Sequence, residues 1–119
     1  MLDNSAFHRK MAIYGRRYVE ELAQWLKSQH KGLRAYKTFQ QKVLEVGSKN
    51  RHQYALYYLL GMLAGRFVDV YDERPLTLDV TDEAHKRLIA VVDKALLYNT
   101  MSAQQQNELL NEIAASELA

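Results

Sequence analysis

The sequence predicts an all-α fold, a single-domain antiparallel bundle of four to five helices. Apolar residues recur at helical spacings of three and four along most of the 119 residues. Only one proline interrupts this pattern, and the connections between the predicted helices are short, which is typical of antiparallel bundles. A chain of this length also fits one domain with its own hydrophobic core.

The first helix is predicted over residues 4–30. Its apolar residues recur at spacings of 4, 3, 4, 4 and 3 and therefore form one stripe: Phe7, Met11, Tyr14, Tyr18, Leu22 and Trp25. Gly32 follows this helix, and glycine suits the left-handed residue that often ends a helix.

The second helix is predicted over residues 33–46, with Gly47 as its end. The third, over residues 51–72, is the most hydrophobic and carries two neighbouring apolar stripes. One contains Leu56, Leu60, Leu63, Phe67 and Val70, and the other contains Tyr54, Tyr58, Gly61, Gly65 and Val68. Two apolar stripes predict a helix that is buried on more than one side.

Gly61 and Gly65 lie one turn apart inside this third helix. Together they cost roughly 2 kcal/mol in helix propensity, a cost that close packing can offset. A position without a side chain lets another helix backbone approach, and Tyr58 and Val68 border the contact. We therefore expect a close helix–helix contact at this stripe.

Arg74 and Pro75 end the third helix, because the residue before proline is disfavoured in the helical region. Apolar and polar residues then alternate over 76–80, which predicts an extended connector. The fourth helix is predicted over residues 81–98, with Thr81 or Asp79 as its N-cap.

The fifth helix is predicted over residues 103–117. Ser102 and Gln105 are spaced as in a capping box, in which each side chain bonds the backbone of the other residue. This pairing fixes the start of the helix.

Charge is unevenly distributed, although the net charge is only +2. Residues 8–51 contain 11 Lys or Arg and 3 acids, whereas residues 52–119 contain 5 bases and 10 acids. The asymmetry indicates either a polyanionic partner for the basic half or pairing between the halves.

Nucleic-acid binding is the alternative function that this basic half suggests. The basic side chains of the first two helices could form one positive surface. The candidate residues are Arg9, Lys10, Arg16, Arg17, Lys27, Lys31, Arg34 and Lys37.

No pattern in the sequence predicts catalysis, a metal or a cofactor. There is no cysteine, no Gly-x-Ser-x-Gly turn and no Glu-x-x-His pair. The remaining enzyme hypothesis is a cation held by the acids between Asp69 and Glu83. Asp72 and Glu73 lie at a predicted helix C-terminus, where the dipole disfavours negative charge, so we expect a basic partner or a cation there.

Protein binding is the leading functional prediction, through a small non-enzymatic regulatory or adaptor protein that forms a homo-oligomer. Eight tyrosines and one tryptophan supply aromatic side chains of the kind enriched at interfaces. The predicted interface contains Tyr54, Tyr58, Gly61, Gly65 and Val68.

The longest apolar run is 12 residues, short of the roughly 20 that span a membrane. With no signal-peptide pattern and no cysteine, a cytoplasmic location is expected.

Overall fold

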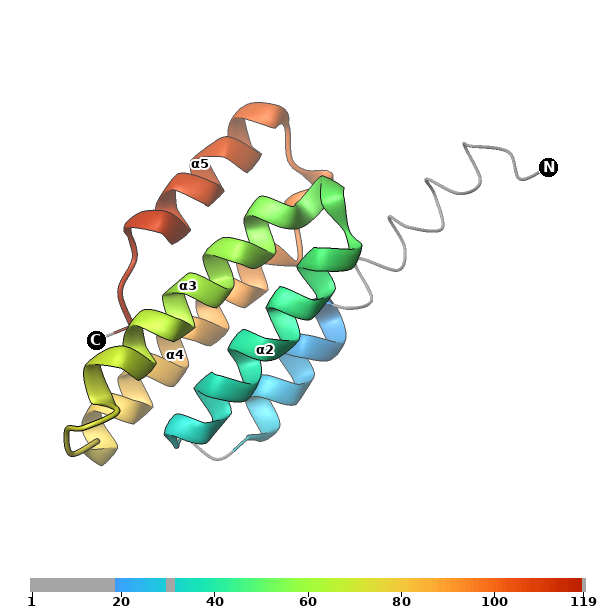
Figure 1. Cartoon of the computed structure of the whole chain (residues 1–119). Coiled ribbons are helices and arrows are strands. Elements are labelled where there is room, and N and C mark those ends of the chain that lie inside the picture. Colours follow the sequence, from blue (N-terminus) through green and yellow to red (C-terminus); the bar gives the residue numbers. More distant parts are fainter. Residues whose placement is uncertain (1–18, 30–31, 119) are drawn as a thin grey trace.

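The computed structural model describes residues 19–29 and 32–118, and most of these residues lie in helices (Figure 1). These described residues contain no strand, so the predicted all-α fold is confirmed. Residues 19–28 are helical. The later elements are α2 (Leu33–Lys49), the 3₁₀ turn η1 (Arg51–Gln53), α3 (Tyr54–Tyr71), α4 (Leu78–Ala95), the 3₁₀ turn η2 (Tyr98–Thr100) and α5 (Ala103–Ala115).

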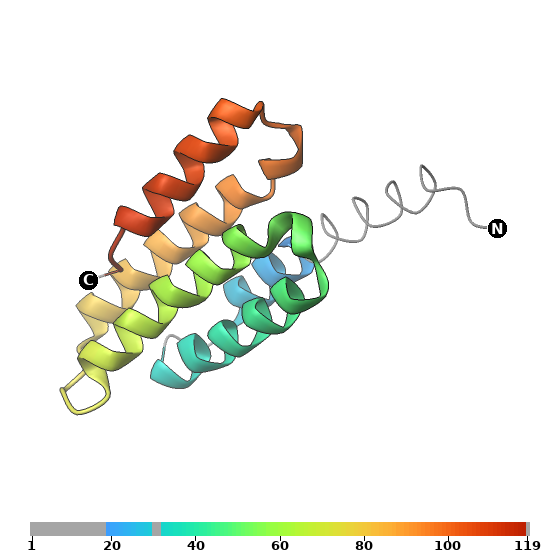
Figure 2. The same cartoon turned by 45° about the horizontal axis from the view of Figure 1, so that its top comes forward.

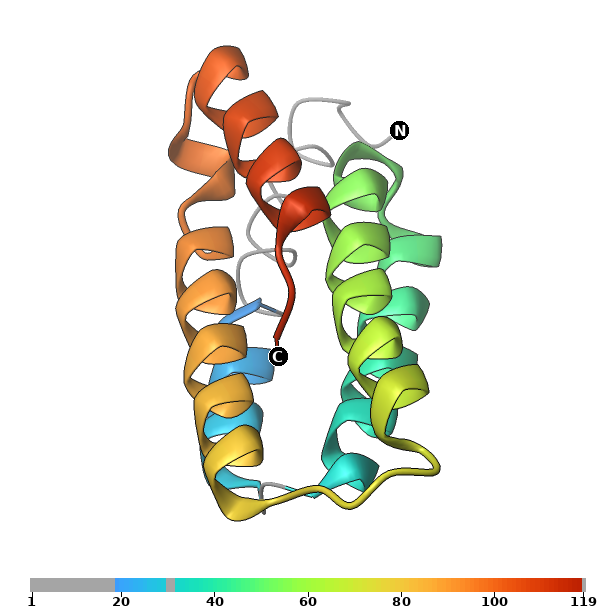
Figure 3. The same cartoon turned by 90° about the vertical axis from the view of Figure 1, so that its left-hand side faces the viewer.

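The helices are arranged around α3. Figures 1 and 2 show α2 and α3 side by side and antiparallel, and Figure 3 shows α5 lying across α3 and α4. The core side chains with no exposed surface include Phe39, Val43, Leu56, Tyr57, Leu60, Leu88, Val92 and Ile113. Since these residues come from α2, α3, α4 and α5, one core joins the four helices.

The first apolar stripe of α3 is buried along most of its length. Leu56, Leu60, Leu63 and Phe67 are at most 4% exposed, but Val70 is 48% exposed because it lies near the end of the helix. The prediction for Val70 is therefore wrong. The apolar residues predicted at 7, 11, 14 and 18 lie outside the described residues.

The close contact expected at Gly61 and Gly65 is present, and its partner is α2. A Cβ added to Gly61 would lie 3.0 Å from Leu44 Cδ2, and one added to Gly65 would meet the side-chain amide of Gln40. Gly47 provides a third close contact from the α2 side. The prediction that Gly47 ends α2 is wrong. Gly47 is buried inside the helix, which continues to Lys49.

Two helix starts differ from the prediction. Gly32 has φ −96° and ψ 166°, which is extended backbone, and it precedes α2 as its N-cap instead of taking a left-handed conformation. Helix α4 begins at Leu78, so the second half of the expected connector is helical. Its cap is Thr77, whose Oγ1 accepts a hydrogen bond from the Val80 amide at 3.3 Å.

The start of α5 agrees with the prediction. The Gln105 amide donates to Ser102 Oγ at 3.2 Å, and the Ser102 amide donates to Gln105 Oε1 at 2.9 Å, which completes the capping box. The helix ends at Ala115, two residues earlier than predicted. Leu118 follows the helix and is 3% exposed.

Candidate protein interface on α2 and α3

An exposed apolar surface lies where α2 and α3 meet. We call it the tyrosine patch and define it as Leu44, Tyr54, Tyr58 and Met62. Their exposed fractions are 41%, 52%, 45% and 41% respectively. The three α3 residues are four positions apart, so they follow one another along a single face of the helix.

The geometry of the tyrosine patch follows from the glycine contact beneath it. The Tyr54 and Tyr58 rings stack with centroids 6.0 Å apart and planes inclined by 15°. Leu44 extends the surface onto α2, because its side chain lies over Gly61, a neighbour of both Tyr58 and Met62 along α3. The patch is therefore one surface built from two helices.

The structure divides the five predicted interface residues into two groups. Tyr54 and Tyr58 are exposed, but Gly61, Gly65 and Val68 are buried. The space over both glycines is occupied by α2 of the same chain, so a second molecule could reach them only by displacing α2. Tyr54 and Tyr58 are therefore the exposed part of the predicted interface, and Gly61, Gly65 and Val68 lie beneath the surface. Met62 was missed although its spacing from Tyr58 is helical, and Leu44 was missed because its place depends on how α2 packs against α3.

The basic side chains predicted to bind a polyanion are partly engaged within the chain. Lys27 pairs with Asp93 at 3.4 Å, and Lys37 pairs with Asp72 at 3.2 Å. Both pairs join the basic half of the sequence to the acidic half. Arg34 is exposed on α2. The remaining candidates, Arg9, Lys10, Arg16, Arg17 and Lys31, lie outside the described residues.

The acidic segment between Asp69 and Glu83 does not converge on a cation site. Within residues 19–29 and 32–118, no group of three or more His, Asp or Glu side chains has an arrangement that could hold a metal ion. Asp72, at the C-terminal end of α3, has the basic partner that the helix dipole led us to expect, and this partner is Lys37.

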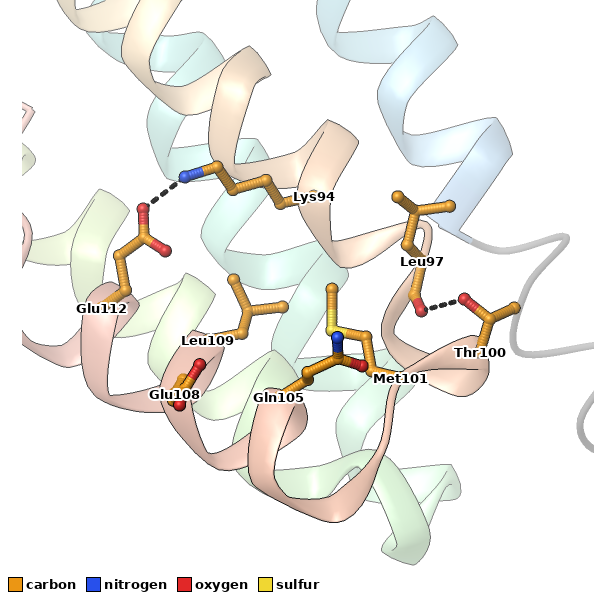
Figure 4. Close-up of a pocket in the computed structure, with 8 residues that line it drawn as sticks. All are labelled: Lys94, Leu97, Thr100, Met101, Gln105, Glu108, Leu109 and Glu112. Atoms are coloured by element: carbon orange, nitrogen blue, oxygen red, sulfur yellow. Dashed lines mark hydrogen bonds and ion pairs between the residues drawn. The ribbon is translucent and has the colours of Figure 1, made fainter.

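A groove of about 420 Å³ lies between the end of α4, η2 and α5 (Figure 4). Leu97, Met101 and Leu109 supply its apolar lining. Its two carboxylates already have partners, because Lys94 pairs with Glu112 and Gln104 Nε2 donates to Glu108 at 3.2 Å. The groove therefore presents one ion pair, Lys94 with Glu112, and one carboxylate bonded to an amide, Glu108, around a small apolar floor.

Two core tyrosines have altered acidity. Burial raises the pKa of Tyr57 to about 12. Burial also raises the pKa of Tyr36, and a hydrogen bond with the Thr81 side chain opposes this shift. The Tyr36 hydroxyl also donates to the Thr81 carbonyl at 3.3 Å. Both tyrosine side chains are at most 1% exposed and pack in the core.

Searches of known protein families, of curated proteins and of solved structures each found no match to this chain. In the part of the chain that the structure describes, every helix is too short or too polar to cross a membrane.

Proposed function

We propose that the chain is a small regulatory or adaptor protein without catalytic activity, which acts by binding protein and forms a homo-oligomer through the tyrosine patch. The observation that carries this proposal is the exposure of four large apolar side chains where α2 and α3 meet. Tyrosine and methionine are enriched at protein interfaces because they offer a large apolar area, and tyrosine adds a polar hydroxyl.

Self-association is supported by the chemistry of the tyrosine patch. A two-fold dimer brings the same surface of both subunits together, so the surface must be compatible with itself. Leu44, Tyr54, Tyr58 and Met62 carry no charge near neutral pH, and two copies would not repel each other. The stacked Tyr54 and Tyr58 rings are also already ordered by contact with each other, which lowers the entropy lost on binding.

The size of the protein across a dilution series tests this proposal. We expect the wild-type chain to dissociate on dilution, and Tyr58→Lys to be monomeric throughout, because a charge would be buried at the centre of the contact. Leu78→Lys is the control, since Leu78 is 79% exposed at the start of α4 and lies outside the tyrosine patch. A Tyr58→Lys chain that associates as strongly as wild type would contradict the proposed interface.

A nucleic-acid-associated regulator is the alternative, and the charge asymmetry of the sequence is its support. Lys27 and Lys37 of this basic set already form ion pairs with Asp93 and Asp72, and a phosphate would have to compete with these carboxylates. Binding to DNA or RNA that weakens steeply with salt, and weakens further in Arg16→Glu and Arg17→Glu, would favour it. For either function we propose a cytoplasmic location, which the absence of cysteine supports.

A further inference from the structure

Figure 3 shows the chain after α5 running between α3 and α4. We call the surface that residues 116–118 contact, which includes Arg66 and Arg87, the seat. The chain leaves the helix in an extended conformation at Ser116, with φ −79° and ψ 153°. Leu118, two positions later, is 3% exposed. A short extended segment, residues 116–118, is thus bound along the surface of the bundle.

The side chains of two arginines donate hydrogen bonds to backbone carbonyls of this segment and of the end of α5. Arg66 on α3 donates from Nη1 to the Ala114 carbonyl at 3.4 Å and from Nη2 to the Ser116 carbonyl at 3.0 Å. Arg87 on α4 donates to the Leu118 carbonyl at 3.5 Å. Ala114 belongs to the last turn of α5, so the extended segment itself receives two of these bonds, at the Ser116 and Leu118 carbonyls. Because both acceptors are backbone carbonyls, these two contacts do not depend on the side chains of the segment.

Side-chain selectivity in the seat comes from one apolar anchor. Leu118 borders a cavity of about 320 Å³ that it does not fill. The lining combines apolar side chains of α3 with three charged ones at the mouth: Leu63, Phe67, Val70 and Tyr71 with Arg66, Asp69 and Glu117. A larger apolar side chain than leucine would therefore bury more surface at this position.

We infer that the seat is a peptide-binding site for an extended segment of a partner protein that carries a large apolar anchor, and that residues 116–118 occupy it in competition. The occupant already present defines the chemistry, namely carbonyls aligned with Arg66 and Arg87 and one side chain in the cavity. An internal competitor lowers the apparent affinity for the partner by the fraction of molecules in which the seat is free. This inference does not depend on self-association through the tyrosine patch.

Fluorescence anisotropy with labelled peptides tests the inference on the full chain. The probes are the peptide of residues 114–118, which covers the carbonyls bound by Arg66 and Arg87, and its Leu118→Phe form. The receptor variant is Leu118→Asp, in which the internal segment no longer fits the apolar seat. We expect this variant to bind the native-sequence peptide at least about tenfold more tightly than the wild-type chain does. The Leu118→Phe peptide should bind more tightly again.

Matched controls separate the seat from other apolar surfaces. A receptor with Leu97→Asp changes a leucine that is 55% exposed elsewhere, and it should bind as wild type does. Adding Arg66→Gln to the Leu118→Asp receptor should weaken binding, because the donors to two carbonyls are altered. Leu118→Ala serves as the receptor if circular dichroism shows that Leu118→Asp is unfolded.

Two results would overturn the inference. The first is the absence of binding of either peptide to a folded receptor in which Leu118 is replaced. The second is a dimer that is lost in Leu118→Asp but retained in Tyr58→Lys, because it would assign the seat to the same segment of a second copy instead of a different partner.

Discussion

Gly47 on α2 lies directly against Tyr57 on α3, so that a Cβ added to Gly47 would be only 2.9 Å from the Cβ of Tyr57. The Cβ position of Tyr57 is fixed by the α3 backbone and cannot rotate away. At Gly61 and Gly65, by contrast, the nearest atoms belong to the ends of the Leu44 and Gln40 side chains. The three glycines therefore permit the same helix contact but differ in how strictly they are required.

Gly47→Ala is expected to destabilise the protein by about 1–2 kcal/mol. Overpacking of a fixed contact costs about 1–3 kcal/mol, and the gain in helix propensity of at most about 1 kcal/mol offsets only part of it. Urea denaturation followed by circular dichroism measures the difference in unfolding free energy.

Gly65→Ala is the matched comparison, and it should change stability by less than about 0.5 kcal/mol in the destabilising direction. The Gln40 side chain can move aside, because Gln40 is only half-buried. Gly61→Ala should fall between the two, since Leu44 can shift on the surface. Equal losses at all three positions would mean that the two backbones, not particular side chains, fix the spacing of α2 and α3.

Periodicity in the sequence was sufficient to predict the class of fold and the approximate position of each described helix. It could not predict the role of Gly47, because a glycine near the end of a helical pattern looks the same whether it ends the helix or packs against a neighbour. Only the position of Tyr57 on another helix distinguishes these roles. The same reasoning succeeded at Gly61 and Gly65, because they lie well inside a strongly apolar helix.

The candidate interface was predictable only in part for a similar reason. Spacing along α3 placed Tyr54 and Tyr58 on one face, but it could not show that α2 covers the glycines on that face. Leu44 belongs to the tyrosine patch because its side chain on α2 packs over Gly61 on α3, and these two residues are far apart in the sequence. The seat of Leu118 depends in the same way on arginines from two other helices.

Thr77→Ala is expected to destabilise the protein by about 1 kcal/mol, the usual cost of losing a helix N-cap. The sequence suggested Asp79 or Thr81 as the cap because residues 76–80 alternate between apolar and polar types. Leu78 is 79% exposed, so this alternation does not reflect burial of one face. Thermal unfolding of Thr77→Ala and of the control Thr77→Ser tests the assignment, because serine retains the capping oxygen. A loss in Thr77→Ser as large as in Thr77→Ala would contradict it.

The contact between Lys37 and Asp72 should contribute little to stability but should explain the acidic end of α3. Both side chains are at least half exposed, at 50% and 57%, and exposed pairs contribute about 0.2–1 kcal/mol. A double-mutant cycle with Lys37→Ala and Asp72→Ala should give a coupling in this range that decreases as salt is added.

The same variants test the carboxylate-held cation. We expect magnesium to raise the melting temperature of wild type and of Asp72→Asn by the same small amount, because Asp72 already has a basic partner. A magnesium-dependent increase that disappears in Asp72→Asn would instead support a cation site at this end of α3.

Stability should decrease at alkaline pH because of Tyr57. Its pKa is raised to about 12 in the folded state by burial, above the ordinary value of 10.0 that applies when the chain is unfolded. The folded state therefore retains a proton that the unfolded state loses. The stability that this proton provides is fully present below about pH 10 and is lost as the pH rises toward about 12, with a slope of up to about 1.4 kcal/mol per pH unit. Burial raises the pKa of Tyr36 in the same direction, so it adds to the slope.

Tyr57→Phe should make this decrease shallower, because phenylalanine keeps the buried ring but has no proton to lose. Unfolding free energies measured in urea at several pH values between about 9 and 12 give the slope for each variant. Tyr58→Phe controls for loss of a hydroxyl at an exposed position, since Tyr58 is 45% exposed whereas Tyr57 has no exposed surface. If wild type and Tyr57→Phe have the same slope, the Tyr57 hydroxyl is not held neutral by the core, and the alkaline loss of stability must come from other groups.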